Sequence, residues 1–288
     1  MKKPLFQGVC TALVTPFING EVNYPMMEQL LRRQLDAGIK AVVISGTTGE
    51  APTLTDEEKL ELFHRAKSFV GDHCLIIAGT GCNSTSRTAE LSLAAQEEGV
   101  DGLLIVSPYY NKATAEGLVA HYLTLAHSVR IPIILYNVPS RTGVDIPLSV
   151  YRRLAPIPNI IGVKEAGNDL TKVTRTCSSC DNFFVWSGSD DYIVPAMALG
   201  AQGVISVLSN VVPVETQAMT SAMLAGDLDT ATALQQQLQP LIDLLFCEVN
   251  PIPVKAAMKY LGYDCGGCRL PLTELGPENQ KRLESYFR

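Results

Sequence analysis

The sequence predicts an α/β protein that folds as a (β/α)8 TIM barrel followed by a small C-terminal helical domain. Short apolar runs, each followed by a polar corner, alternate with segments of helical periodicity over the first three-quarters of the chain. After Gly226 this alternation stops and only helical patterns follow. We therefore expect the barrel over residues 1–226 and the helical domain over residues 227–288.

Eight apolar runs are expected to form the strands of the barrel. They are short and bounded by Gly, Pro or polar residues, which is typical of buried parallel strands. The runs cover residues 9–14, 41–44, 75–78, 102–106, 131–135, 160–163, 183–186 and 203–207. A doubly wound sheet is the alternative, but it usually has five or six such units, and no GxGxxG follows the first run.

Helical segments lie between these runs. Met27, Leu30 and Leu31 share one helical face, and Thr55 with Glu58 forms a capping-box pattern that opens a helix ending before Gly71. The first of these helices covers residues 25–37. Other helices are expected over residues 85–98, 115–129, 170–176, 191–199 and 213–224, and in the C-terminal domain over 229–248, 253–261 and 277–287.

Composition excludes several classes of function. The chain has 288 residues, of which 47% are hydrophobic, so it can bury a large core. Its formal charge of −6 argues against a nucleic-acid partner or an anionic membrane surface. No apolar run is long enough to span a bilayer, and no small-residue cleavage site follows the first apolar run. We expect a cytoplasmic protein.

Eight cysteines include two CxxC pairs, Cys177 with Cys180 and Cys265 with Cys268. Their separation is far beyond the spacing of a zinc ribbon or finger, and the first pair closes a helix instead of opening one after a strand. We therefore expect free thiols. All four histidines fall in expected helices or their caps, so the strand ends carry no ligand set for a catalytic metal, and no metal is expected.

Lys164 is the main candidate for chemistry. It ends the apolar run that begins at Ile160, and chemistry in such barrels gathers where strands end. Burying an ammonium group without a partner is costly, so such a group tends to lose its proton, and a neutral amine is what Schiff-base chemistry needs. The alternative is a strand-end lysine that reaches water or pairs with an acid.

Strand alternation predicts the neighbours of Lys164. If Lys164 points into the barrel, Gly162 and Ile160 do so too, with Gly162 leaving room beneath the amine, while Glu165 faces the helices and is a structural partner there. Tyr136, at the end of the preceding strand, would stand beside the lysine and could move protons.

Two groups near the strand ends could receive carboxylates. The loop Gly46-Thr47-Thr48-Gly49 offers N–H groups and hydroxyls, although it lacks the spacing and lysine of a phosphate loop. Arg141 offers a guanidinium fork for a second carboxylate. Together with an imine-forming lysine, these groups predict chemistry on a small keto acid.

The chain also resembles a known family, the pyruvate-dependent class I aldolases of the dihydrodipicolinate synthase and N-acetylneuraminate lyase group. The matching motifs run through the whole chain in the family's order: GTTGE at 46–50, PYYN at 108–111, YNVPSRTG at 136–143, GVKE at 162–165, GVIS at 203–206 and NPIPVK at 250–255. The resemblance implies a catalytic barrel that joins pyruvate to L-aspartate 4-semialdehyde without a cofactor, on the route to lysine and diaminopimelate.

The same resemblance implies a role for each site residue. Lys164 would form the Schiff base with pyruvate. Tyr136, Thr47 and Tyr110 would relay protons, with Tyr110 contributed across a tight dimer interface of a homotetramer built as a dimer of tight dimers. Thr48 would bind the pyruvate carboxylate and Arg141 the carboxylate of the semialdehyde. The carbonyl groups of Gly188 and Ile205 would face the pyruvate pocket.

One departure from the family pattern concerns regulation. Family members that lysine inhibits bind it with residues that this chain matches only at Asn83 and Tyr109. Ala51, Pro52, Asp56, Lys59 and Arg87 depart from the pattern, and Arg87 would repel an ammonium group. We expect weak or absent inhibition by lysine.

Two other functions remain open at this point. One is an aldolase for N-acetylneuraminate or another keto-deoxy sugar acid, for which Arg141 would find no second carboxylate. The other is a barrel that binds a keto acid as a sensor without converting it, against which the complete set of relay residues argues.

Overall fold

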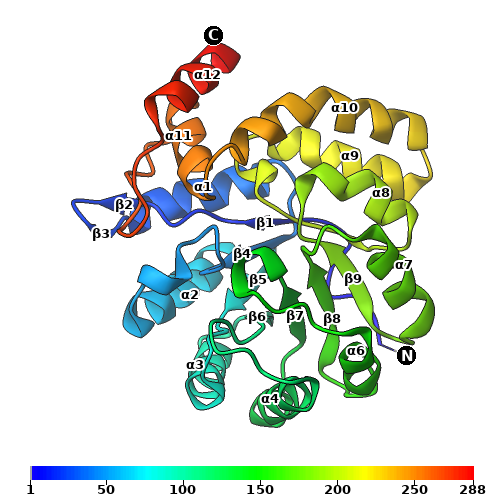
Figure 1. Cartoon of the computed structure of the whole chain (residues 1–288). Helices are drawn as coiled ribbons and strands as arrows, with labels where there is room; N and C mark the ends of the chain where they lie inside the picture. Colours follow the sequence, from blue (N-terminus) through cyan, green and yellow to red (C-terminus); the bar gives the residue numbers. More distant parts are fainter. Residues whose placement is uncertain (1) are drawn as a thin grey trace.

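The computed structural model describes residues 2–288 and shows a closed barrel of eight parallel strands surrounded by helices (Figure 1). Around the barrel the strands follow the order β1, β10, β9, β8, β7, β6, β5, β4. Their bounds are β1 Gly8–Ala12, β4 Ala41–Ile44, β5 Leu75–Gly79, β6 Gly102–Val106, β7 Ile133–Asn137, β8 Ile160–Glu165, β9 Phe184–Ser187 and β10 Gly203–Ser206. The predicted barrel is confirmed, and each expected strand lies within about two residues of its position.

The expected helices are also present. Those around the barrel are α1 Tyr24–Asp36, α2 Asp56–Val70, α3 Thr85–Glu97, α4 Ala115–Ser128, α7 Leu170–Ser179, α8 Ile193–Ala198 and α9 Pro213–Ala225. The capping box of α2 forms as predicted, because the Thr55 hydroxyl accepts from Glu58 N while the Glu58 carboxylate accepts from Thr55 N.

Two short helices and a hairpin are among the small elements that were not expected from the sequence. The helix α6 (Leu148–Leu154) completes the ring between β7 and β8, and the single-turn helix α5 (Pro139–Thr142) follows β7 directly. A two-stranded hairpin, β2 (Phe17–Ile18) and β3 (Glu21–Val22), follows β1. These elements are too short to leave a clear periodicity in the sequence.

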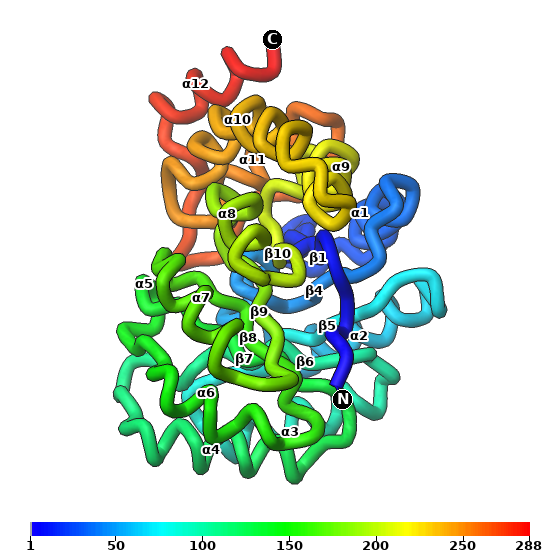
Figure 2. Tube along the Cα trace, turned by 90° about the vertical axis from the view of Figure 1, so that its right-hand side faces the viewer, coloured from blue at the N-terminus to red at the C-terminus, as the bar shows by residue number. Residues whose placement is uncertain are grey.

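The last three helices gather on the side of the barrel that carries α8, α9 and α1, away from α3 and α4 (Figures 1 and 2). They are α10 (Leu228–Leu245), α11 (Ile252–Tyr260) and α12 (Pro277–Phe287), with no strand between them. Helix α10 packs against α9 and α8. Gly226 ends α9 in the left-handed conformation with φ of 80°. The division into domains at this residue stays a prediction.

Two apolar clusters stabilise the barrel. The larger lies between the strands and the helices, and the smaller fills the barrel interior. Inside the barrel, Phe6 stacks on Trp186 with 5.1 Å between ring centroids, and the Trp186 indole donates to Phe6 O. Because Phe6 precedes β1, these rings fill the N-terminal end, so the open end is the one where the strands finish.

One prediction about strand faces is wrong. Ile160 belongs to the cluster that faces the helices, whereas Ile161 belongs to the barrel interior. The cause is an irregularity between β7 and β8, where Ile133 pairs with Ile160 but Ile134 pairs with Gly162. This bulge accommodates an extra residue and reverses the alternation before Gly162. Beyond the bulge, Val163 faces the helices and Lys164 the barrel mouth, as expected.

Among residues 2–288, no helix is both long and apolar enough to cross a membrane. Within the same range, no three His, Cys, Asp or Glu side chains cluster in a way that could hold a metal ion.

Candidate active site

A pocket of about 270 Å³ opens at the carboxyl ends of the barrel strands. Six of the eight site residues predicted from the sequence line it: Thr47, Thr48, Tyr136, Arg141, Lys164 and Gly188. These residues come from loops and strands that are distant in the sequence, and the closed barrel brings their strand ends to one rim.

Lys164 lies in the inner part of this pocket and is only 5% exposed. It pairs with Tyr136 on the neighbouring strand, and its Nζ lies 4.5 Å from the centroid of the tyrosine ring. On the other side, a Cβ at Gly188 would lie 3.0 Å from Lys164 Cε. A side chain at residue 188 would therefore press on the amine, which gives Gly188 a steric reason to be glycine.

The Gly46–Gly49 turn presents Thr47 and Thr48 to the pocket. The turn is closed by bonds from Gly49 N and Ala51 N to Gly46 O. It continues into Glu50, whose φ of 56° turns the chain sharply. The buried Glu50 carboxylate pairs with Lys255 Nζ at 2.6 Å, and this contact ties the turn to α11.

Arg141 lies at the rim of the pocket on α5, which starts at Pro139 and ends at Gly143 in the left-handed conformation. The side chain is exposed and lines the pocket of Lys164. A guanidinium at the rim of the pocket can contact the outer part of a molecule bound at Lys164.

Two predicted site residues do not line the pocket. Tyr110 is 91% exposed and adopts φ of 74°, so its ring projects from the surface of this chain. Ile205 is fully buried on β10 and belongs to the cluster that fills the barrel interior.

Glu165 points toward the helix layer, the direction that alternation predicts. It accepts hydrogen bonds from Asn137 Nδ2 at 2.6 Å and Tyr151 OH at 3.0 Å, and Lys172 Nζ lies 3.6 Å away. Burial raises the pKa of Glu165, while the nearby Lys172 ammonium opposes that rise. These contacts make Glu165 a structural link between β8 and the helices α6 and α7.

Several residues near the site were missed by sequence reasoning. Asp190 is fully buried beside the site, and one of its carboxylate oxygens accepts from Val207 N and Leu208 N, both at 2.9 Å. Burial raises the pKa of this carboxyl, and hydrogen bonds from the Ser206 side chain and the Leu208 and Val207 N–H groups oppose the rise. Helix α10 and the segment after it add Asp243, Phe246 and Asn250 to the pocket wall. The motif around Asn250 was visible, but nothing in the sequence showed that it reaches the barrel mouth.

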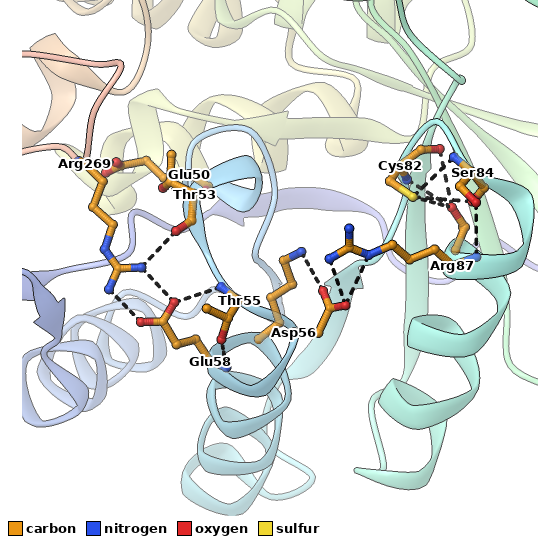
Figure 3. A network of polar contacts seen from close by, with 11 residues as sticks. Glu50, Thr53, Thr55, Asp56, Glu58, Cys82, Ser84, Arg87 and Arg269 are labelled. Atoms are coloured by element: carbon orange, nitrogen blue, oxygen red, sulfur yellow. Dashed lines mark hydrogen bonds and ion pairs between the residues drawn. The ribbon is translucent and has the colours of Figure 1, made fainter.

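A second cavity, of about 370 Å³, lies beside the first and shares Thr47, Tyr136 and Arg141 with it. Its wall includes Asp56, whose carboxylate pairs with Lys59 at 3.2 Å and with Arg87 at 3.1 Å (Figure 3). These ion pairs hold the pKa of Asp56 below its usual value, against the effect of partial burial. The charges of the three residues sum to about +1 at neutral pH.

All eight cysteines are free thiols. Burial raises the pKa of Cys265 and of Cys268 to about 12, and that of Cys177 to about 11. A thiol with a raised pKa is a poor nucleophile and a poor metal ligand near neutral pH.

The closed parallel barrel carries a buried lysine, a tyrosine and two threonines in a pocket at the carboxyl ends of its strands. This arrangement is typical of (β/α)8 enzymes that use a lysine amine in catalysis. Residues 5–288 match the model of the dihydrodipicolinate synthetase family. The chain belongs to this family.

Curated relatives cover nearly the whole chain. The 4-hydroxy-tetrahydrodipicolinate synthase of Exiguobacterium sibiricum is 48% identical, over 99% of this chain and 98% of that protein. The synthase of Acetivibrio thermocellus is 44% identical, over 100% of this chain and 98% of that protein. A solved structure of dihydrodipicolinate synthase from Thermotoga maritima has a TM-score of 0.96 at 39% identity and covers 98% of this chain and 97% of its own.

Proposed function

We propose that this chain condenses pyruvate with L-aspartate 4-semialdehyde to 4-hydroxy-tetrahydrodipicolinate, the activity for which its relatives are named, in lysine and diaminopimelate biosynthesis. The single observation that supports this most strongly is the position of Lys164, buried in the mouth of the barrel between Tyr136 and Gly188. An amine shielded from bulk water beside a phenol is suited to imine formation.

The chemistry follows from this geometry. The Lys164 amine adds to the keto carbon of pyruvate and water leaves, which gives an imine. Loss of a methyl proton converts the imine to an enamine, whose carbon attacks the aldehyde and forms the new C–C bond and a hydroxyl group. The amine of the former semialdehyde then displaces Lys164 from the imine carbon, so the ring closes and the enzyme is regenerated.

Each residue around Lys164 has a separate role in this reaction. The phenol of Tyr136 moves protons to and from the imine and the new hydroxyl, in a relay with Thr47 and Tyr110. Thr48 holds the pyruvate carboxylate, and the carbonyl groups of Gly188 and Ile205 face the pyruvate. Arg141, at the outer rim, holds the carboxylate of the semialdehyde, which agrees with its exposed position on the pocket wall.

The relay requires a second copy of the chain. Tyr110 is exposed and does not line its own pocket, and its positive φ is a strained conformation of the kind that clusters at functional sites. We infer that its ring enters the site of a partner subunit, in a homotetramer built from two tight dimers. The cytoplasmic location expected from the sequence also stays a prediction.

Mixing two inactive variants tests this assembly. Lys164→Ala and Tyr110→Phe should each be nearly inactive as pure oligomers. A mixed dimer contains one site with Lys164 from one subunit and Tyr110 from the other, so activity should return when the two are unfolded and refolded together. No recovery in verified mixed dimers would place Tyr110 outside the relay across the interface.

Borohydride trapping tests the proposed function itself. Pyruvate with borohydride should add one reduced pyruvate unit to the peptide that contains Lys164, and the Lys164→Ala variant should gain no mass there. In parallel, turnover should be seen with aspartate semialdehyde and not with N-acetylmannosamine. A keto-acid sensor would bind pyruvate but give no adduct, and a sugar-acid aldolase would prefer the second aldehyde.

Regulation by lysine is expected to be weak or absent. The cavity that holds Asp56, Lys59 and Arg87 carries an excess of positive charge, which disfavours a cationic amino acid. A titration of activity with L-lysine should leave most of the activity in place at millimolar concentrations. Near-complete inhibition by submillimolar lysine would contradict this expectation.

A further inference from the structure

Asn250 touches the site from the C-terminal segment. It lies between α10 and α11, about two hundred residues beyond Thr48 in the sequence. Its Nδ2 donates a hydrogen bond to Thr48 Oγ1 at 3.0 Å. Both side chains line the pocket of Lys164, and both are buried, with 3% of Thr48 and 5% of Asn250 exposed.

This contact determines what the Thr48 hydroxyl can still do. A hydroxyl has one proton to donate and two lone pairs that accept. The amide of Asn250 occupies a lone pair, so the proton must point elsewhere. Within residues 2–288, the hydrogen bond from Asn250 is the only one that the Thr48 hydroxyl makes. Its proton is therefore free to go to a molecule in the pocket.

We propose that Asn250 is a positioning residue that orients the Thr48 hydroxyl as a donor toward the carboxylate of the keto acid bound at Lys164. The inference rests on the proposed function, because it assumes that the pocket takes such an acid. The Oδ1 atom of Asn250 is buried and has no hydrogen-bond partner among the described residues. An uncharged amide is suited to this place, since a carboxylate would take the hydroxyl proton and repel the bound acid.

A second contact holds the two segments together. Glu50 follows Thr48 by two residues, and Lys255 follows Asn250 by five, and their side chains form the buried 2.6 Å ion pair described above. Lys255 Nζ also donates to Gly267 O at 3.0 Å. The ion pair thus joins the segment that carries Thr48 to the segment that carries Asn250. The geometry of the Thr48–Asn250 hydrogen bond is therefore fixed by the fold, not by the ligand.

The variant Asn250→Asp tests the proposal with little change of shape. The introduced carboxylate accepts only, so it should draw the Thr48 proton away from the ligand. We expect the KM for pyruvate to rise about ten- to a hundredfold, as for loss of a hydrogen bond to a charged group. The KM for aspartate semialdehyde and kcat should change less than threefold or so.

The pH dependence of the Asn250→Asp variant gives a readout that a purely structural role would not produce. Once protonated, the introduced carboxyl can again donate to Thr48, so the rise in pyruvate KM, relative to wild type, should shrink as the pH falls toward 5. In combination with Thr48→Val, the uncharged variant Asn250→Ala should add little to the KM for pyruvate, because both changes act on the same donor. Additive effects of the two variants would overturn the proposal.

Controls separate the possible failures. Circular dichroism and thermal unfolding check that the variant folds. If it does not, Asn250→Ala takes its place, with an expected rise in pyruvate KM of about three- to tenfold, because the hydroxyl then rotates freely. Equal rises in both KM values, or none, would overturn the inference. If the wild type gives no pyruvate adduct on Lys164, the proposed function fails instead.

Discussion

Lys164 and Tyr136 form the central contact of the site. The amine lies over the face of the phenol ring, 4.5 Å from its centroid, on adjacent strands that are paired in register. A ring in this position shields the amine from water on one side and keeps a titratable hydroxyl near the place where substrate protons must be exchanged.

Removal of that hydroxyl should slow catalysis more than it weakens binding. We expect Tyr136→Phe to lower kcat by about a hundred- to ten-thousandfold, while the KM for pyruvate changes little, because the ring and its packing remain. Tyr286→Phe, at an exposed position on α12, serves as the matched control and should keep full activity. If Tyr136→Phe retained more than about a tenth of wild-type kcat, the phenol would not be the main proton carrier.

At the residue scale, the reacting groups could be predicted from the sequence, but the buried residues that contact them or the loops around them could not all be predicted. Lys164, Tyr136 and Thr48 follow apolar runs, and a strand end is a position that pattern reasoning finds. Asn250 and Asp190 could not be assigned in the same way. Asn250 reaches Thr48 through a fold-dependent contact between distant segments, and the role of Asp190 depends on the backbone N–H groups of the loop after β10.

The bulge in β8 is the main irregularity among the barrel strands. Gly162 follows it, and a Cβ at this position would lie 2.1 Å from Phe184 O on β9. The glycine thus permits a close approach of two strand backbones, instead of leaving room beneath the Lys164 amine as the sequence had suggested. The bulge itself sets which residues enter the barrel, and it could not be predicted because it depends on pairing with β7.

A pair of glycine substitutions tests this explanation. Gly162→Ala should lower the free energy of unfolding by about 3 kcal/mol or more, since backbone atoms of β9 must move. Gly117→Ala, within α4, meets only ordinary contacts at 3.5 Å and should raise stability by about 0.5 to 1 kcal/mol. Urea denaturation measures both. A Gly162→Ala protein as stable as wild type would show that the β8–β9 contact is not tight.

Helix α4 carries a buried histidine, His121, that should lower the stability of the fold at low pH because it stays neutral when folded. His121 bonds through Nδ1 to the Thr85 hydroxyl at 2.9 Å, and burial lowers its pKa to about 4. As the pH falls from 6.5 to 4, the unfolded chain takes up a proton that the folded chain does not. The free energy of unfolding should therefore decrease over this interval, by about 3 kcal/mol in total from this residue.

Replacing this histidine should remove that part of the pH dependence. Between pH 6.5 and 4, His121→Gln should lose about 3 kcal/mol less stability than wild type. His127→Gln, at an exposed position on the same helix, is the control and should follow the wild-type curve. Parallel curves for His121→Gln and wild type would rule out a buried neutral imidazole.

Strand and helix positions in the barrel were predictable because buried strands and amphipathic helices leave periodic patterns several residues long. The helix α6 was missed because it has only seven residues and no side-chain cap. The hairpin β2–β3 has strands of two residues, which is below the length at which alternation can be recognised. Pattern length, more than residue type, therefore limited the prediction.

At the scale of the whole molecule, the buried ion pair of Lys255 with Glu50 joins the barrel to the C-terminal helices. Lys255 on α11 is almost fully enclosed with Glu50, and its Nζ also lies 4.2 Å from the centroid of the Phe17 ring. Truncation of the lysine would leave a carboxylate buried without its counter-charge, and such a group is costly.

We expect Lys255→Met to lower the free energy of unfolding by about 3 to 5 kcal/mol and to weaken pyruvate binding through the displaced Thr48 turn. Lys259→Met, at an exposed position on the same helix, should change stability by less than about 0.5 kcal/mol. Thermal unfolding and pyruvate KM measured side by side would show both effects. Unchanged stability of Lys255→Met would mean that the pair does not hold the two parts together.

The stacked rings of Phe6 and Trp186 have a kinetic consequence. They pack inside the barrel toward its N-terminal end, whereas the pocket of Lys164 opens at the other end, so we expect both reactants, the expelled water and the product to use that opening. The compound joined to the amine lies deepest, and its reaction partner must approach over it. Ping-pong kinetics with the keto acid bound first follow from this arrangement, and departing product should compete with that acid for the same amine.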